Sequence, residues 1–400
     1  MGAPLVAVAG GGAGLFLLNV DLGATGLPAR LPLASVGWLA LAACWAPVLW
    51  LRTQPRSRPP VPTTPGASCC FATLAALALA SSLWSVHPAR TAVVAGVSIG
   101  AFGGAAVLTT RLGWPAVVRL ASAAVGAFLL AGLVRDAVAG PLLRDPIGSF
   151  SGRHRLAGLS FSATDLGRIA AFGVLFAVLA ARQRGGAPRA AHAMVAAVAV
   201  LALATSGTRL IAVSLGVLAA VLLLRRRSAS GLAAAAVLAV AVLAAASRPD
   251  AVIGLIGRPG ESEDHVLDLA GRTPIWGAAE RAWAERPLLG HGWGANEVVL
   301  QEALYRDELR FSAYTAHNLL LGVLVDGGLV AAALLVAGLA ALVRGLHGHG
   351  EAMLTLLLVV LTGTLEATFS RPALVIAVVG MLTAAATHRN EQRRPGWSRR

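Results

Sequence analysis

The residues best suited to chemistry gather in one polar stretch, Arg248 to Thr315, within a chain that otherwise consists of successive apolar segments. A long polar loop between membrane spans is a common place for function. The stretch contains Arg272 and His291, and His317 follows directly after it. Arginine binds phosphate through a planar fork of N–H donors, and histidine can take up a proton near neutral pH. These residue types therefore suit the binding of an oxyanion such as phosphate and the uptake of a proton.

Arg272 immediately precedes a predicted short helix in the loop. Thr273 can cap a helix whose first residue is Pro274, and Pro287 ends the pattern. A guanidinium there adds to the partial positive charge of the helix N-terminus, which suits an oxyanion such as phosphate. One face of the helix carries Trp276, Ala279 and Trp283. An amphipathic helix that anchors at the outer membrane interface is therefore the alternative interpretation.

Two further residues have a comparable setting. Arg209 begins the returning helix after the tight turn Ser206-Gly207-Thr208, where it either binds an anion or reaches lipid headgroups by snorkelling. His317 follows the predicted cap Thr315 and should lie in the first turn of the next helix. A helix N-terminus disfavours imidazolium, which leaves a neutral ring able to accept a proton. A structural role is the alternative for His317, and the same alternative holds for His291.

The composition identifies the class of protein that must position these residues. The chain has 400 residues, of which 56% are hydrophobic and only 13% are charged, and its mean hydropathy is +0.72. Soluble domains carry roughly a quarter charged residues, so this is an integral membrane protein. The net charge of +14 comes from arginines scattered between apolar runs, so it reflects topology and does not indicate nucleic-acid binding. The spacing of Cys44, Cys69 and Cys70 fits neither a disulfide framework nor a zinc site.

Apolar runs near the length of roughly 20 residues that crosses a bilayer predict an all-α fold with about twelve transmembrane helices. The long extracytoplasmic loop contains short helices. The predicted spans are Pro4 to Val20, Leu31 to Leu51, Cys69 to Trp84, Thr91 to Thr110, Ala116 to Val134, Leu166 to Ala181, Ala190 to Thr205, Arg209 to Leu224, Gly231 to Ser247, Leu319 to Val343, Ala352 to Thr368 and Ala373 to Thr387.

The orientation follows from arginine clusters, because basic residues stay in the cytoplasm. Clusters fall on one side of the layout at 52–58, 182–189, 225–227 and 389–400. We therefore predict a multi-pass protein of the cytoplasmic (inner) membrane with both termini in the cytoplasm and the 248–315 loop outside. The chain divides into N-terminal membrane helices at 1–247, the extracytoplasmic loop with the active site at 248–318, and C-terminal helices with a cytoplasmic tail at 319–400.

Taken in order, several motifs resemble the O-antigen ligase and polymerase family of bacterial envelope glycosyltransferases. They are Ser85-Val86-His87-Pro88, Arg155-Leu156-Ala157-Gly158, Ser206-Gly207-Thr208-Arg209, Gly271-Arg272 with Trp276, Pro287-Leu288-Leu289-Gly290-His291-Gly292, Ala316-His317-Asn318 and Asp326-Gly327-Gly328. The resemblance covers most of the chain. No single motif is strong, and the order, spacing and outer placement carry the resemblance jointly.

The resemblance implies a metal-independent transferase without a cofactor that acts in polysaccharide biosynthesis of the cell envelope. It would move a glycan from a polyprenyl diphosphate carrier, such as undecaprenyl diphosphate, to a hydroxyl of a glycan, lipid or protein acceptor at the outer face, among membrane lipids. Carried over by position, Arg209 and Arg272 would bind the diphosphate. Asn318 and Arg155 would be further substrate-binding residues, and His317 would act as base or orient the acceptor. Two fixed guanidiniums suit a leaving diphosphate that gains charge as the glycosidic bond breaks.

Two other classes of function remain open from the sequence. The many spans also fit a transporter of a small solute or anion, for which Glu366 and Asp326 would be the main acidic relay candidates. A noncatalytic scaffold for envelope assembly is the third possibility, and it would leave Arg209, Arg272 and His317 without a role. Glycan transfer from a lipid diphosphate by the isolated protein would distinguish the three.

Overall fold

The computed structural model describes residues 65–139, 156, 159–160, 163–183, 187–225, 272–306, 316–365 and 373–392. Every element in these ranges is helical. The predicted spans before Cys69 and the one from Gly231 to Ser247 lie outside the described residues, as do Cys44, Arg155 and Glu366.

Apolar stretches bounded by proline, glycine or polar residues form the helices. They are α3 (Pro65–Ala80), the short 3-10 helix η2 (Ser81–Leu83), α4 (Pro88–Leu112), α5 (Trp114–Ala139), α6 (Ala163–Arg182), α7 (Ala187–Ser206), α8 (Arg209–Arg225), α12 (Arg272–Glu285), α13 (Asn296–Arg306), α14 (Leu319–Gly345), α15 (Gly350–Leu365) and α16 (Ala373–Gln392). In the part of the chain that the structure describes, six helices are long and apolar enough to cross a membrane: α3 with η2, α4, α5, α6, α7 and α14. The described part of this membrane protein is therefore all-helical, and the total of about twelve spans stays a prediction.

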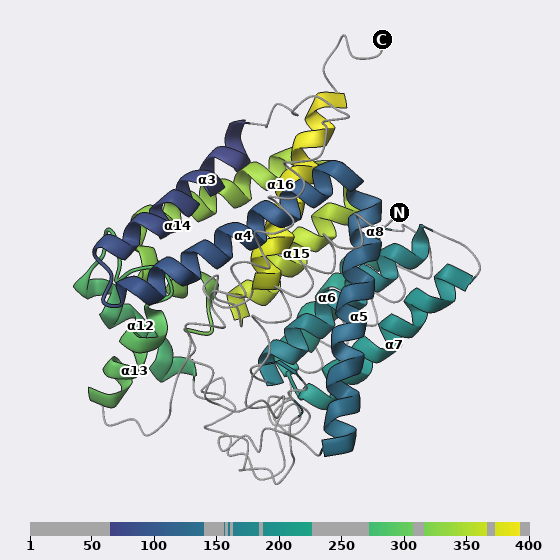
Figure 1. The fold of residues 1–400 in the computed structure, drawn as a ribbon, viewed down its shortest axis with the longest axis horizontal. Helices are drawn as coiled ribbons and strands as arrows, with labels where there is room; N and C mark the ends of the chain where they lie inside the picture. The colour runs from purple at the N-terminus through teal and green to yellow at the C-terminus, as the bar shows by residue number, and fades with distance from the viewer. Residues whose placement is uncertain are drawn as a thin grey trace.

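The helices form two packed groups joined through α15 and α16 (Figure 1). α3 packs along α14 and α4 along α16, whereas α6 packs against α5 and α7. Helices from the N-terminal part of the chain, α3 and α4, thus lie beside helices from its C-terminal part, α14 and α16. The division of the chain at 1–247, 248–318 and 319–400 remains a prediction. Small residues allow the close packing that membrane helices favour: a side chain at Gly380 would overlap the carbonyl of Phe102.

Buried surface is distributed very unevenly among these helices. Of the α6 span, 78% is buried inside the protein, against 17% for α7. α6 is therefore an interior helix, and its side chains face protein on nearly all sides. A charged residue on α6 must accordingly be stabilised by other residues of the protein, because lipid or water does not surround it.

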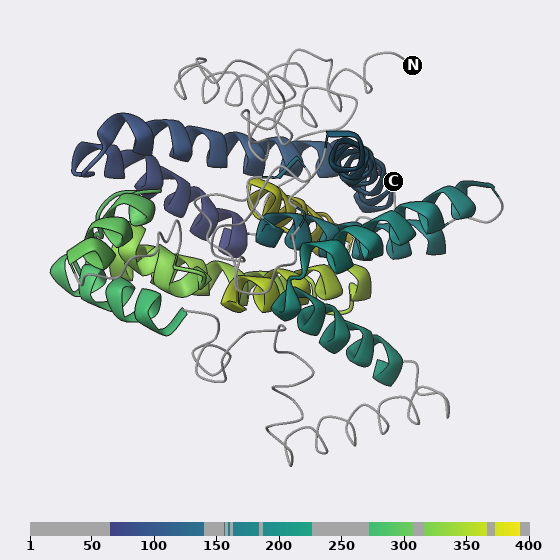
Figure 2. The ribbon, with the colours of Figure 1, turned by 90° about the horizontal axis from the view of Figure 1, so that it is seen from below.

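Contacts between helix ends show which connections share one end of the molecule. The start of α15 contacts the start of α5 and the end of α6, through hydrogen bonds from Trp114 and Gln183 to Glu351 of 3.3 and 3.5 Å. At the opposite end, Asn318 just before α14 donates to the Thr364 carbonyl near the end of α15 at 3.3 Å. The starts of α6 and α14 therefore lie at the same end. α12 and α13 also lie at the end where α3, α4 and α14 meet, as two perpendicular views show (Figures 1 and 2).

Candidate active site

The Pro287 to Gly292 motif docks onto a break in α14. Gly328 interrupts this helix with φ 64° and ψ −163°, which leaves backbone groups without helical partners. The motif supplies them: the N–H of His291 donates to the Val325 carbonyl at 2.9 Å, and the N–H of Leu329 donates to the Pro287 carbonyl at 2.8 Å. This part of the resemblance is therefore an architectural joint between the loop and the membrane helix.

Glycine is required on both sides of this joint. Gly290 has φ 64°, and a Cβ there would lie 2.6 Å from the backbone of Asp326. A Cβ on Gly328 would overlap the Leu288 carbonyl. Positive φ angles and close backbone approach both favour glycine, so local geometry explains why these positions carry it.

Asp326 anchors the start of α13 at the same joint. Its carboxylate is buried and accepts hydrogen bonds from the backbone N–H of Asn296 at 2.8 Å and from the Asn296 side-chain amide at 2.9 Å. A buried carboxylate needs such donors. These bonds account for Asp326 structurally, without the acidic relay that a transporter would need.

The short loop after α3 docks onto the other side of the motif. The N–H of Val86 donates to the His291 carbonyl at 3.2 Å, and the indole of Trp84 donates to the Leu289 carbonyl at 3.3 Å. Arg90 at the start of α4 forms an ion pair with Glu297 of α13. The Ser85 to Pro88 motif therefore positions the polar loop, and the two segments lie at the same end of the molecule.

α12 differs from its prediction at its beginning and on its buried face. It begins at Arg272, so the prediction that Thr273 caps a helix starting at Pro274 is wrong. Pro274 is the third residue of the helix, where a missing N–H still costs no helical hydrogen bond. The buried face consists of Ile275, Ala278, Ala279 and Ala282. The two tryptophans flank this face and tie the helix to neighbouring segments: Trp276 donates to the Ala316 carbonyl at 3.0 Å, and Trp283 donates to the Pro287 carbonyl at 3.1 Å.

His317 lies before α14 and not in its first turn, which corrects the prediction of Thr315 as cap. The cap is Asn318, whose side-chain oxygen accepts from the N–H groups of Leu320 and Leu321 at 2.9 and 3.1 Å. His317 has φ 46°, in the left-handed region that residues other than glycine rarely adopt. Such backbone strain is concentrated at functional sites, where the surrounding structure maintains it.

The imidazole of His317 is held neutral by its surroundings. Burial, followed by the positive charges of Arg272 and Arg168, lowers the pKa of His317 to about 3. Both effects disfavour the charged ring. The predicted neutral imidazole is thus present for a different reason: burial and two arginines produce it, whereas the sequence argument relied on a helix N-terminus.

Arg168 is a residue that the sequence analysis did not select. It lies in α6 with 4% of its surface exposed, and its guanidinium forms an ion pair of 3.1 Å with Asp165 three residues earlier. The signal available in the sequence was this acidic and basic pair at helical spacing, inside an otherwise apolar run. Arg168 acts electrostatically on the same ring as Arg272, so its charge bears on the candidate site at His317.

The turn before Arg209 packs directly on the start of α6. α8 begins at Arg209, as predicted, although the Arg209 side chain is outside the described part of the chain. The Thr208 hydroxyl contacts Ser206 at 2.7 Å and donates to the Ala163 carbonyl at 3.2 Å. Leu156, which follows the predicted Arg155, donates its N–H to the Thr205 carbonyl at 3.2 Å. The predicted motifs around residues 156 and 206–209 therefore meet.

Four segments consequently converge at one end of the molecule: the starts of α6, α12 and α14, and the α7–α8 turn. They bring the guanidiniums of Arg168 and Arg272 close to a neutral imidazole at His317. Guanidiniums bind and stabilise a phosphate group, and a neutral imidazole accepts a proton. Within the described ranges, no three His, Cys, Asp or Glu side chains gather as a metal site would require.

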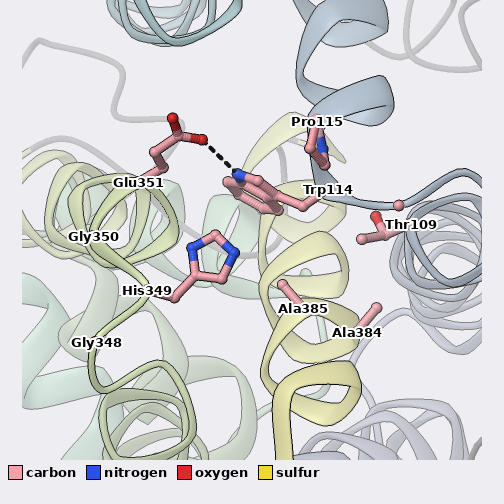
Figure 3. A pocket seen from close by; sticks show the side chains of 10 residues that line it. Thr109, Trp114, Pro115, Gly348, His349, Gly350, Glu351, Ala384 and Ala385 are labelled. Carbon is pink, nitrogen blue, oxygen red and sulfur yellow. Dashed lines mark hydrogen bonds between the residues drawn. The ribbon is translucent and has the colours of Figure 1, made fainter. Parts of the chain in front are cut away.

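A cavity of about 480 Å³ lies at the opposite end, between the α4–α5 turn and the start of α15 (Figure 3). Trp114 donates to Glu351 across it at 3.3 Å, and the rings of Trp114 and His349 meet edge to face with centroids 5.6 Å apart. Arg272, His317 and Asn318 are absent from the described residues that line this cavity. The hollow and the charged cluster are therefore separate features.

Comparison with known proteins identifies part of the chain. Residues 192–336 match the family model described as O-antigen ligase. No curated protein matches the chain. The matched segment includes Arg209, Arg272, His317 and Asn318, whereas Arg168 precedes it. The chain thus carries an O-antigen ligase domain over residues 192–336, and the family resemblance drawn from its sequence is confirmed.

Proposed function

We propose that the protein is an envelope glycosyltransferase of the O-antigen ligase type. It transfers or polymerises a glycan from a polyprenyl diphosphate carrier onto an acceptor hydroxyl at the outer face of the cytoplasmic membrane. The O-antigen ligase domain and the apolar helices support the class of enzyme. The observation that carries the proposal is the meeting of α12 with the segment before α14, where Trp276 donates to the Ala316 carbonyl at 3.0 Å and the charge of Arg272 acts on the neutral imidazole of His317.

The reaction balances with the groups at this site. The acceptor oxygen attacks the anomeric carbon and forms the new glycosidic bond, while the bond from that carbon to the diphosphate oxygen breaks. The electron pair of the broken bond leaves with the polyprenyl diphosphate, whose growing charge Arg272 and Arg209 stabilise. The proton of the acceptor hydroxyl passes to the imidazole of His317. Asn318 and Arg155 contribute further contacts to substrate in this proposal.

Donor binding would also make His317 a stronger base. Burial, and after it the positive charges of Arg272 and Arg168, make the imidazole hold a proton poorly, which its pKa of about 3 reflects. A bound diphosphate brings negative charge next to the ring, and a nearby opposite charge favours imidazolium. The base would therefore become effective when donor is present, which would limit proton uptake to the loaded site.

The direct test is transfer by purified protein in vesicles containing a polyprenyl diphosphate-linked oligosaccharide and an acceptor glycan. We expect a lengthened glycan and free polyprenyl diphosphate in equal amounts, and the same rate in excess chelator. Absence of both products across a panel of acceptors would overturn the proposal. Loss of transfer with chelator, restored by magnesium or manganese, would overturn its metal-independent form.

The proposed topology has its own test. Single cysteines at Glu302 and Ser228, in a chain without Cys44, Cys69 and Cys70, should react oppositely with an impermeant thiol reagent in intact cells. We expect labelling at 302, because arginine clusters put that loop outside, and protection at 228. Equal labelling of both positions would remove the outer-face assignment of the site.

A further inference from the structure

Arg168 is a charged residue in the interior of a membrane protein. α6 is buried over 78% of its span, and the Arg168 side chain is 5% exposed. Burying an ion pair requires desolvation of both charges, and an apolar pair of similar size is often at least as stable. Charged residues inside membrane proteins accordingly mark functional sites more often than they add stability.

The packing of α6 brings this arginine to the turn that carries Arg209. Gly167 directly precedes Arg168, and a Cβ at Gly167 would overlap the Thr208 side chain and approach the Ser206 hydroxyl at 2.9 Å. Thr208 also donates to the Ala163 carbonyl in the first turn of α6 at 3.2 Å. Two independent contacts therefore fix the first turns of α6 against the turn that ends at Arg209.

The charge of Arg168 also reaches the ring of His317, together with that of Arg272. Asp165 is the carboxylate paired with Arg168, and it balances one of these two positive charges. Two guanidiniums that act on one neutral ring suit a ligand with several negative charges. A guanidinium has five N–H donors in one plane, so it can hold Asp165 and a phosphate oxygen together.

We propose that Arg168 is a donor-binding residue, a third guanidinium that contacts the diphosphate from α6 while Asp165 fixes its orientation. This inference rests on the proposed function, because it concerns the same donor. It assigns a substrate contact to a helix that lies before residues 192–336, the segment matched by the O-antigen ligase family. Discrimination between a diphosphate and a monophosphate carrier then depends in part on α6.

The test compares binding of undecaprenyl diphosphate and undecaprenyl monophosphate to full-length purified protein. Arg168→Lys keeps the charge but loses the planar fork. We expect diphosphate affinity to fall by about tenfold or more, with a smaller loss for monophosphate. Arg182→Gln is the matched control, because Arg182 is exposed at the other end of the same helix, and its affinities should equal those of the wild type.

A double variant separates binding from support of the fold. Asp165→Leu with Arg168→Met removes both charges and leaves an apolar pair, which should preserve the unfolding temperature. If the pair only supports α6, this variant binds diphosphate normally; we expect instead the same loss as in Arg168→Lys. Normal diphosphate binding by either folded variant overturns the role of Arg168 and leaves the transferase proposal intact. A wild-type protein that shows no preference for diphosphate would instead contradict the proposed function itself.

Discussion

The two ends of the helical bundle differ in what they offer a ligand. At one end, a docked loop and four helix or turn segments bring Arg168, Arg272 and His317 together. At the other end, a cavity of about 480 Å³ lies between Trp114 and Glu351. The described residues that line this cavity include a carboxylate and no arginine, so it would repel the anionic donor that the first end would attract. Charge therefore favours the first end as the candidate site, although the cavity lies at the second end.

The difference also concerns how each end is built. The cavity lies among turns rich in glycine, including Gly113, Gly348 and Gly350. The charged end is held by backbone hydrogen bonds between segments far apart in sequence, such as the bond from Gly292 to Asp326 of 2.9 Å. A rigid support holds charged groups in place before the reaction begins. Such preorganised groups cost little reorganisation free energy when charge develops in the transition state.

The largest expected effect is on transfer after His317→Ala. Loss of a positioned base should lower the transfer rate by about 10² to 10⁴, while binding of polyprenyl diphosphate is retained. His349→Ala changes the histidine at the cavity end and should transfer normally. Rates and donor affinities measured at matched expression decide the comparison. Normal transfer by His317→Ala together with an inactive His349→Ala would reverse the assignment of the two ends.

Arg272→Lys should have the next largest effect. A lysine keeps the charge but cannot make the planar, bidentate contact, so transfer should fall by about 10- to 100-fold, equivalent to one charge-assisted hydrogen bond of about 1.5–3 kcal/mol. Arg344→Lys is the control, because Arg344 is exposed in the last turn of α14 at the cavity end. Near-normal turnover of donor by Arg272→Lys would support the membrane-anchor interpretation of α12.

Gly290→Ala tests the joint that supports the charged end. The positive φ and the approach to Asp326 should together lower the stability by about 1 to 3 kcal/mol, seen as a lower unfolding temperature in detergent. Gly103→Ala in α4 is the control, because a Cβ there meets no described atom within 4 Å. Equal unfolding temperatures for the two variants would show that the joint does not limit stability.

The smallest expected effect is a dependence of stability on pH that comes from His317. Its ordinary pKa of 6.5 applies to the unfolded chain, and burial lowers the folded pKa to about 3. Between these values the unfolded state binds more protons, so stability present above pH 6.5 decreases as the pH falls. The unfolding temperature of His317→Gln should therefore decrease less than that of the wild type between pH 7 and 4. Identical decreases would show that the ring is not held neutral.

The sequence predicted the elements of this fold better than their junctions. Apolar runs identified the six described helices that are long and apolar enough to cross a membrane, and the turn at Ser206 correctly predicted that α8 begins at Arg209. The cap of α14 was assigned to Thr315 although Asn318 provides it, since both residue types cap helices and the pattern cannot choose between them. Asp326-Gly327-Gly328 was selected as a motif, but the helix break at Gly328 depends on partners supplied by the distant Pro287 segment.

The candidate site was predictable only where motifs indicated it. Arg272 and His317 follow from the polar loop, and the structure adds that both charge and burial keep the imidazole neutral. Arg168 was missed because a single arginine near the predicted start of a span resembles an ordinary boundary residue. Its significance depends on the burial of α6 and on the contact between Gly167 and Thr208, which are tertiary facts.

The joint in α14 also limits how the length of this chain can vary. Its backbone hydrogen bonds have a fixed register: Pro287 pairs with Leu329, His291 with Val325, and Gly292 with Asp326. One residue inserted between Pro287 and Gly292 would shift this register and leave the helix break without its partners. Insertions before Arg272 would not change the pairing. Among relatives, length differences should therefore accumulate on the N-terminal side of α12, while the spacing from Pro287 to Gly292 stays constant.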